Sequence, residues 1–190
     1  MHFFDVIAPL YDFFAPGLEN TIRHLKEIGN FSHNDIVLDM GGGTGRVAER
    51  LRPWVKEIIV ADISKKMLRQ CERKELRSVL ISGTILPFAD AYFDKVVIVD
   101  AFHHFQDKRG TMREIKRVLK PGGSIIIEEF NPVRLGGKWI VFVEKILMLG
   151  SVFYVPEHLR DFLTNEGFES ALYESDTKEY YVVAMKIIEK

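Results

Sequence analysis

The chain has 190 residues, of which 47% are hydrophobic and 28% are charged, and its formal net charge is −1. This balance is typical of one globular domain with a sizeable core, and it excludes the strong basic excess that many nucleic-acid-binding proteins carry. The single cysteine, Cys71, excludes an intrachain disulfide and fits a reducing compartment.

Two segments bear on export and membrane insertion. The first residues of the chain contain no basic region followed by an apolar run, so they do not form a signal peptide. The longest apolar segment, residues 139–155, is interrupted by Glu144 and Lys145 and falls short of a membrane span. We therefore expect a cytoplasmic protein without a membrane span.

Residues 1–32 precede the first predicted strand and form an N-terminal arm. The beginning of the arm is rich in aromatic side chains. Residues 17–28 then carry apolar side chains at helical spacing, namely Leu18, Ile22, Leu25 and Ile28. The arm is therefore predicted to contain a helix.

The chain is organised around residues 36–51. An apolar run at 36–38 predicts a buried strand, and residues 47–51 resemble the start of a helix. Between them lie four glycines: Gly41, Gly42, Gly43 and Gly45. Glycines allow positive φ angles and let a ligand approach the backbone closely, so this segment indicates the start of a nucleotide-binding βαβ unit.

The spacing of these glycines indicates which ligand is bound. A dinucleotide fingerprint, G-x-G-x-x-G, fails in one register at Arg46 and in the other at Thr44. An acidic-x-G-x-G-x-G pattern does fit, with Asp39, Gly41, Gly43 and Gly45. That pattern resembles the first motif of the class I S-adenosylmethionine-dependent methyltransferases. A glycine turn without a ligand is the alternative reading.

The N-terminal arm extends this resemblance. Residues 4–12 read Phe-Asp-x-Ile-Ala-x-x-Tyr-Asp, which is similar to the arm of family members that act on quinone precursors and related small molecules. In that family the arm folds over the cofactor pocket, so the resemblance implies that Tyr11 approaches the cofactor. The alternative is that the aromatic residues simply pack a helix onto the domain.

A second apolar strand, residues 57–62, ends in Asp62. An acid at this position can accept hydrogen bonds from both hydroxyls of a ribose. Ser64 is a suitable N-cap for the next helix, whose first turn contains Met67. The run from Asp62 to Met67 resembles the second motif of the family, which implies that Ile63 flanks the adenine ring.

The third strand is predicted at residues 78–82 and is followed by Gly83 and Thr84. The family usually has an aspartate where this chain has Ser82, and that carboxylate accepts the adenine amino group. A hydroxyl can accept the same hydrogen bond less strongly, and a neighbouring backbone group could also serve. The substitution puts the adenine contact in question but leaves the fold prediction unchanged.

The fourth strand, residues 93–100, ends at Asp100 and is followed by His103 and His104. Strand ends on this side of an open α/β sheet form the ligand crevice, so both histidines are candidates for a general base. The alternative is that one of them packs or hydrogen-bonds a loop. The segment lacks the Asn/Asp-Pro-Pro-aromatic sequence of enzymes that methylate exocyclic amino groups of bases, which argues against such an activity.

Residues 108–119 form an amphipathic helix in this reading, and Lys120-Pro-Gly-Gly123 ends it. The fifth strand is predicted at residues 124–130. Residues 117–123, Arg-Val-Leu-Lys-Pro-Gly-Gly, match a recognisable signature of the family, to which we assign a topological role and no chemistry.

Residues 131–155 form an insertion that the fold does not require, with an apolar helix at 139–148. Three readings are open for it: core packing, a lid over an apolar acceptor, or a dimer surface. A helix follows from Pro156 at its first turn to a glycine C-cap at Gly167. Residues 168–173 and 180–188 are predicted to close the sheet as an antiparallel pair.

Together these elements predict one α/β domain over residues 1–190, with a Rossmann-like, doubly wound, seven-stranded sheet that is mostly parallel and has an antiparallel last strand. The resemblance implies S-adenosyl-L-methionine as cofactor and implies no metal site. The expected cofactor contacts are Tyr11, Asp39, Gly41, Gly43, Gly45, Asp62, Ile63, Met67, Ser82, Gly83, Thr84 and Asp100, and the catalytic candidates are His103 and His104.

The expected function is methylation of a small, apolar acceptor, with no nucleic-acid partner and with a homodimer as one use of the insertion. The alternative is a catalytically silent cofactor-binding subunit that regulates a partner. A nicotinamide oxidoreductase is a third hypothesis, which the glycine spacing disfavours. The acceptor atom is left open, because fold and cofactor site do not specify it.

Overall fold

A computed structural model of the chain describes residues 17–81, 84–146, 150–175 and 178–188. The strands run in the order β1 Ile36–Met40, β2 Glu57–Asp62, β3 Arg77–Leu80, β4 Phe93–Val99, β5 Leu119–Phe130, β6 Phe168–Glu174 and β7 Glu179–Lys186. The helices are α3 Leu18–Gly29, α4 Arg46–Leu51, α5 Lys65–Arg73, α6 Lys108–Val118, α7 Leu135–Ile146 and α8 Pro156–Asn165, with short 3₁₀ turns at Arg52–Trp54 and Phe102–His104.

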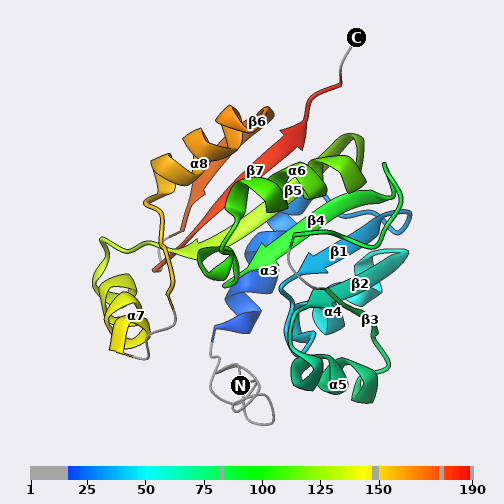
Figure 1. Cartoon of the computed structure of the whole chain (residues 1–190), viewed down its shortest axis with the longest axis horizontal. Helices are drawn as coiled ribbons and strands as arrows, with labels where there is room; N and C mark the ends of the chain where they lie inside the picture. The colour runs from blue at the N-terminus through cyan, green and yellow to red at the C-terminus, as the bar shows by residue number, and fades with distance from the viewer. Residues whose placement is uncertain (1–16, 82–83, 147–149, 176–177, 189–190) are drawn as a thin grey trace.

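The strands form one seven-stranded sheet in the order β3-β2-β1-β4-β5-β7-β6 (Figure 1). The pairings from β3 through β5 are parallel, whereas β7 is antiparallel to both β5 and β6. The predicted Rossmann-like sheet with an antiparallel last strand is therefore confirmed. The chain moves outward from β1 to β3 and then returns to place β4 on the other side of β1, which creates a switch point between β1 and β4.

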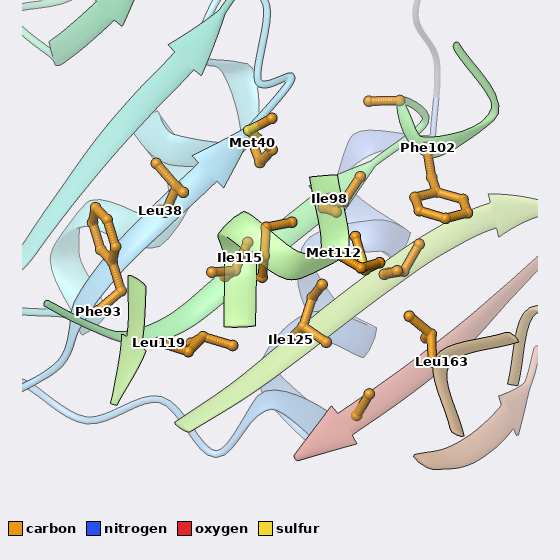
Figure 2. Close-up of a cluster of buried hydrophobic side chains, with 14 of the residues drawn as sticks. Leu38, Met40, Phe93, Ile98, Phe102, Met112, Ile115, Leu119, Ile125 and Leu163 are labelled. Atoms are coloured by element: carbon orange, nitrogen blue, oxygen red, sulfur yellow. The ribbon is translucent and has the colours of Figure 1, made fainter. Parts of the chain in front are cut away.

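Helices cover both faces of the sheet. On one face, the buried side chains of α3, α4 and α5 pack on Val37, Val60 and Ile126. On the other face, α6 and α8 contribute Met112, Ile115, Leu159 and Leu163 to a second core that contains Leu38, Ile98 and Ile125 (Figure 2). Alternate residues of each central strand point to opposite faces, so strands that are buried on both sides are apolar throughout.

Local sequence signals set the ends of several helices. The Ser64 hydroxyl accepts a hydrogen bond from the Met67 amide at 3.2 Å, which confirms the predicted N-cap of α5. The Asp107 carboxylate caps α6 by accepting from the Gly110 amide at 2.8 Å. Pro156 begins α8 as predicted, and Gly167 beyond its end has a φ of +83°.

Several predicted boundaries differ from the structure, most of them by one or two residues. Strand β5 begins at Leu119 and not at Ser124, because the proline–glycine segment that ends α6 is itself extended and forms an irregularity in the pairing with β4. Helix α7 begins at Leu135, four residues earlier than predicted. Strand β3 ends at Leu80, and β7 ends at Lys186. Hydrogen bonding beyond the apolar runs decides these ends, so side-chain pattern alone misplaces them.

Candidate functional site

A cleft opens at the carboxyl ends of the strands, at the switch point between β1 and β4. It contains about 790 Å³ of space, part of it open to solvent. This is the position where open α/β sheets bind ligands. Its lining consists of Asp39, Gly41, Gly42, Gly43, Arg46, Val47, Asp62, Ile63, Met67, Ile81, Val99, Asp100, Ala101, His104 and Phe105.

The glycine loop between β1 and α4 forms the floor of the cleft. Gly41, Gly43 and Gly45 have φ angles of +73°, +56° and +74°, which L side chains rarely adopt. Among the described residues, an added Cβ at Gly43 would meet only the Met67 sulfur, at 3.9 Å, so this backbone is open toward the cleft. Gly45 has a different role, because its Cβ would lie 2.5 Å from Leu76 and it permits close packing of α4.

Asp62, at the end of β2, is hydrogen-bonded to this loop. Its Oδ2 accepts a hydrogen bond from the Gly43 amide at 3.0 Å, and its Oδ1 accepts from the Ser64 amide at 2.8 Å. Ile63 is half exposed beside it and Met67 is buried, and all three residues line the cleft. The carboxylate is thus held in one orientation and keeps further acceptor capacity for a ligand.

Asp39 lies under the same loop and is 1% exposed. Its carboxylate fills the space where a Gly42 side chain would begin, 2.5 Å from the Cβ position. Neither of its oxygens makes a hydrogen bond within normal geometry to the described residues. Burial raises the pKa of Asp39 to about 7, and the Ala48 amide and the Arg46 charge only partly oppose this shift.

Asp100 follows β4 in a left-handed backbone conformation, with a φ of +51°. Arg46, the first residue of α4, donates to its Oδ2 at 2.9 Å across the cleft. The other oxygen, Oδ1, is buried and has no hydrogen-bond partner among the described residues. Burial raises the pKa of Asp100 to about 6, although the Arg46 charge lowers it. Strained backbone beside an unsatisfied acceptor is a pattern found at ligand sites.

The two histidines have different surroundings. His104 lines the cleft, and its Nδ1 lies 3.0 Å from the Ser151 hydroxyl. His103 does not line it and is 2% exposed. Its Nδ1 lies 2.8 Å from Glu129 Oε2, and its backbone amide donates to Glu129 Oε1 at 3.1 Å. Both histidines therefore contact other protein groups, and His104 is the one of the two that also lines the cleft.

Not every predicted site residue reaches the cleft. Tyr11, Ser82 and Gly83 lie outside the described residues, whereas Gly45 and Thr84 are described but do not line the cleft. Sequence reasoning missed Arg46 and Glu129. Arg46 directly follows the last glycine of the motif, and that position was a usable signal. Glu129 is a charged residue inside an apolar strand, which was a second signal, although its partner could not be identified from the sequence.

The charges of the cleft fit the implied cofactor. Among the described lining residues, three carry carboxyl groups (Asp39, Asp62 and Asp100) and one is an arginine, so this part of the lining carries more acidic than basic groups. Such a site suits a ligand with a sulfonium and an ammonium charge, and it would repel a pyrophosphate. Within the part of the chain that the structure describes, no group of three or more His, Cys, Asp or Glu side chains is placed to hold a metal ion.

Comparison with known proteins agrees with this geometry. The family model for a methyltransferase domain matches residues 38–127. The chain is 32% identical to a demethylmenaquinone methyltransferase of Thermotoga maritima, over 89% of this chain and 87% of that protein. It is 33% identical to the ubiquinone/menaquinone biosynthesis C-methyltransferase UbiE of Wigglesworthia glossinidia brevipalpis, over 64% of this chain and 51% of that protein. The chain spans about half the length of several such curated relatives.

Solved structures share the fold. One from Thermotoga maritima, described as a SAM-dependent methyltransferase and possible histamine N-methyltransferase, superposes with a TM-score of 0.82. The match covers 96% of this chain and 98% of that one at 19% sequence identity, so it establishes the common architecture.

Proposed function

We propose that this chain, which belongs to the S-adenosylmethionine-dependent methyltransferases, methylates a small apolar acceptor of the quinol type. The observation that carries the proposal is the cleft at the switch point, where an open glycine backbone, an oriented carboxylate and an unsatisfied buried carboxylate oxygen meet. The names of two relatives, which refer to demethylmenaquinone and to ubiquinone/menaquinone biosynthesis, support the acceptor class.

In this proposal, each part of the cofactor has a partner in the cleft. Asp62 would accept the ribose hydroxyls, since its carboxylate is already oriented by two amides. Ile63, Met67 and Ile81 supply the apolar walls for an adenine ring. Asp100 Oδ1 would accept from the ammonium group of the methionine moiety, and Arg46 would lie near its carboxylate. When bound, the cofactor supplies a methyl group that its sulfonium charge has already activated.

The protein then contributes mainly orientation and exclusion of water. Phe105, Ala101 and Val99 form an apolar wall beside the loop, where an aromatic acceptor ring could lie. A quinol becomes a stronger nucleophile when it loses a hydroxyl proton. His104 faces the cleft and is the described histidine placed to take that proton on a ring nitrogen. Glu129 and His103 position the turn that carries His104.

The test uses the purified chain, S-adenosylmethionine with a labelled methyl group and a short-chain demethylated naphthoquinol. We expect label in the naphthoquinol product, and we expect His104→Ala to lower kcat/KM by roughly 10²–10⁴-fold while cofactor affinity stays unchanged. His158→Ala, an exposed histidine on α8, is the matched control and should behave like the parent.

A second variant examines the positioning pair. Glu129→Gln should shift the pH dependence of kcat, because it alters the partner of His103 and with it the surroundings of His104. If Glu129 had only a structural role, the Glu129→Gln variant would instead have a lower folded fraction and an unchanged pH dependence of kcat.

Unchanged turnover in His104→Ala would remove that histidine from the mechanism. Failure to label any naphthoquinol would refute the proposed acceptor class.

A further inference from the structure

Helix α7 carries an exposed apolar face that the cleft does not use. Leu135, Trp139 and Phe142 are 87%, 66% and 54% exposed, and we call these three residues the outer stripe. Their spacing of four and three residues puts them on one side of the helix, and the rings of Trp139 and Phe142 lie 5.8 Å apart. Figure 1 shows α7 at the periphery of the molecule, away from the sheet. Exposed apolar residues that cluster in this way mark an interaction surface.

The opposite side of α7 fixes the orientation of the stripe. At Gly137 an added Cβ would lie 1.8 Å from the Asn131 carbonyl oxygen, so only a glycine allows the helix to approach the chain so closely. Arg134, just before the helix, donates to the Ser175 carbonyl at 2.6 Å and pairs with Glu174 at 3.2 Å. The start of α7 is therefore fastened to the end of β6, and the outer stripe is held outward.

The charges beside the stripe identify its partner. Lys138 and Lys145 are exposed and lie seven residues apart, so both flank the same edge of the stripe. A short helix with tryptophan and phenylalanine on one face and lysines along its edge has the composition of helices that lie in a lipid–water interface. With 12 residues, α7 is about 18 Å long and too short to span a bilayer. None of the helices in the described part of the chain has the length and apolar content that a bilayer crossing requires.

Residues 151–153, which follow α7 in the chain, contact both histidines. The Val152 amide donates to the His103 carbonyl at 2.9 Å, and the Ser151 hydroxyl lies 3.0 Å from His104 Nδ1. The Phe153 ring stacks on the His103 ring, with centroids 4.3 Å apart. The described residues that follow α7 in the chain thus lie against the turn that carries the candidate base.

From these contacts we propose that the outer stripe docks the protein on an anionic lipid surface, with Trp139 and Phe142 in the interface and Lys138 and Lys145 toward the headgroups. Lipid docking rests on the proposed function, because an apolar quinol partitions into lipid and would reach the cleft from there. The binding itself depends only on α7 and can be measured without any acceptor.

The experiment measures binding to vesicles made of equal parts phosphatidylglycerol and phosphatidylcholine. The parent should cosediment with them, and Trp139→Ser/Phe142→Ser should bind at least about tenfold more weakly. Trp54→Ser/Ile85→Ser removes two exposed apolar side chains outside α7 and should bind like the parent. Lys138→Gln/Lys145→Gln should lose the preference for phosphatidylglycerol over pure phosphatidylcholine, unlike Lys56→Gln/Lys65→Gln.

Tryptophan fluorescence tests whether α7 itself contacts the lipid. The chain has two tryptophans, so in the Trp54→Phe variant Trp139 is the only reporter, and its emission should shift to the blue when vesicles are added. Equal vesicle binding by the parent and the stripe variant would overturn the proposal. A parent that is dimeric without lipid and a stripe variant that is monomeric would also overturn it, in favour of a second copy of the chain as the occupant.

Failure of the two proposals can be distinguished. A short-chain naphthoquinol that dissolves in water should be methylated equally by the parent and by the stripe variant, because it does not need the lipid surface. Vesicle binding that is lost in the stripe variant supports docking, even where no naphthoquinol is methylated. Methylation without vesicle binding supports the proposed function and refutes docking.

Discussion

The carboxyl group of Asp39 is the least exposed of the three acids that line the cleft, and it lies beneath the glycine loop without a hydrogen bond of normal geometry to the described residues. Its pKa is raised to about 7 from an ordinary value of 3.8, chiefly by burial. Between these pH values the folded protein binds more protons at this site than the unfolded chain. Stability from this group is therefore highest in mild acid, and it falls as the pH rises toward and past 7.

Asp39→Asn removes this dependence. We expect the variant to be more stable than the parent at pH 8, by an amount bounded by about 4 kcal/mol from the shift in pKa, and nearly equal to it near pH 4. Urea unfolding of the cofactor-free protein at both pH values measures the difference. Asp161→Asn, an exposed carboxylate on α8, should show the same small effect at both. A variant that gains no stability at high pH would show that Asp39 is accommodated as a charged group.

Also at the scale of single residues, the histidine pair shows why a motif alone does not assign a role. His103 and His104 are adjacent in the sequence and follow the same strand. One is buried against Glu129, and the other lines the cleft. Alternation along β5 puts Glu128 and Glu129 on opposite faces of the sheet, so Glu129 meets His103 while Glu128 accepts a hydrogen bond from Thr21 of α3 at 3.1 Å.

At the scale of elements, Arg117 ties α6 to the segment between β3 and β4. Its guanidinium donates to the carbonyls of Leu86 and Phe88 at 2.9 and 2.8 Å and also pairs with Glu114 and Asp90. Residues 117–123, Arg-Val-Leu-Lys-Pro-Gly-Gly, therefore do more than end the helix, because Arg117 also holds α6 against the segment between β3 and β4. The same pairing lowers the pKa of Glu114 to about 2 through the hydrogen bond from Arg117.

Arg117→Lys keeps the charge but cannot reproduce the planar fork of donors. We expect it to lose about 1–3 kcal/mol of unfolding free energy, because two carbonyls lose their partner. Chemical denaturation at neutral pH provides the measurement. Arg109→Lys on the same helix is the control, since that side chain is 75% exposed and its ion pair with Glu166 has a distance of 3.4 Å. Similar losses of unfolding free energy in both variants would show that the planar guanidinium of Arg117 stabilises the fold no more than a lysine ammonium does.

At the scale of the whole molecule, the described lining of the cleft includes residues of β1, β2, β4, α4 and α5, which are separate in the sequence, so occupancy should stabilise the entire domain. At one hundred times its dissociation constant, S-adenosylhomocysteine should add about 2.7 kcal/mol. For a chain of this length that corresponds to a rise in Tm of roughly 5–10 °C. Because acidic side chains dominate the lining, NAD at the same concentration should leave Tm unchanged.

Scanning calorimetry of the full chain with each ligand checks this expectation. Asp62→Asn should reduce the shift produced by S-adenosylhomocysteine, because it removes a charge-assisted acceptor that two amides hold in place. A shift with NAD and none with S-adenosylhomocysteine would refute the assignment of the cleft.

The sequence by itself determined the types and order of the elements and the location of the glycine loop. It also determined the caps at Ser64 and Pro156. These features depend on interactions within a few residues, such as strand alternation, positive φ at glycine and a hydroxyl that reaches an amide three residues away. The resemblance to the family motifs assigned Gly43 and Asp62 to the same site, but it did not indicate the hydrogen bond between them.

Only the tertiary structure decided which residues meet across the sheet. Arg46 reaches Asp100 over 54 positions of sequence, Glu129 reaches His103 over 26, and Gly45 faces Leu76 and not the cleft. The same holds for the outward side of α7, which was read from sequence as core, lid or interface. Apolar periodicity specifies that a helix has an apolar face, but the strand order and the contacts at Gly137 and Arg134 decide where that face points.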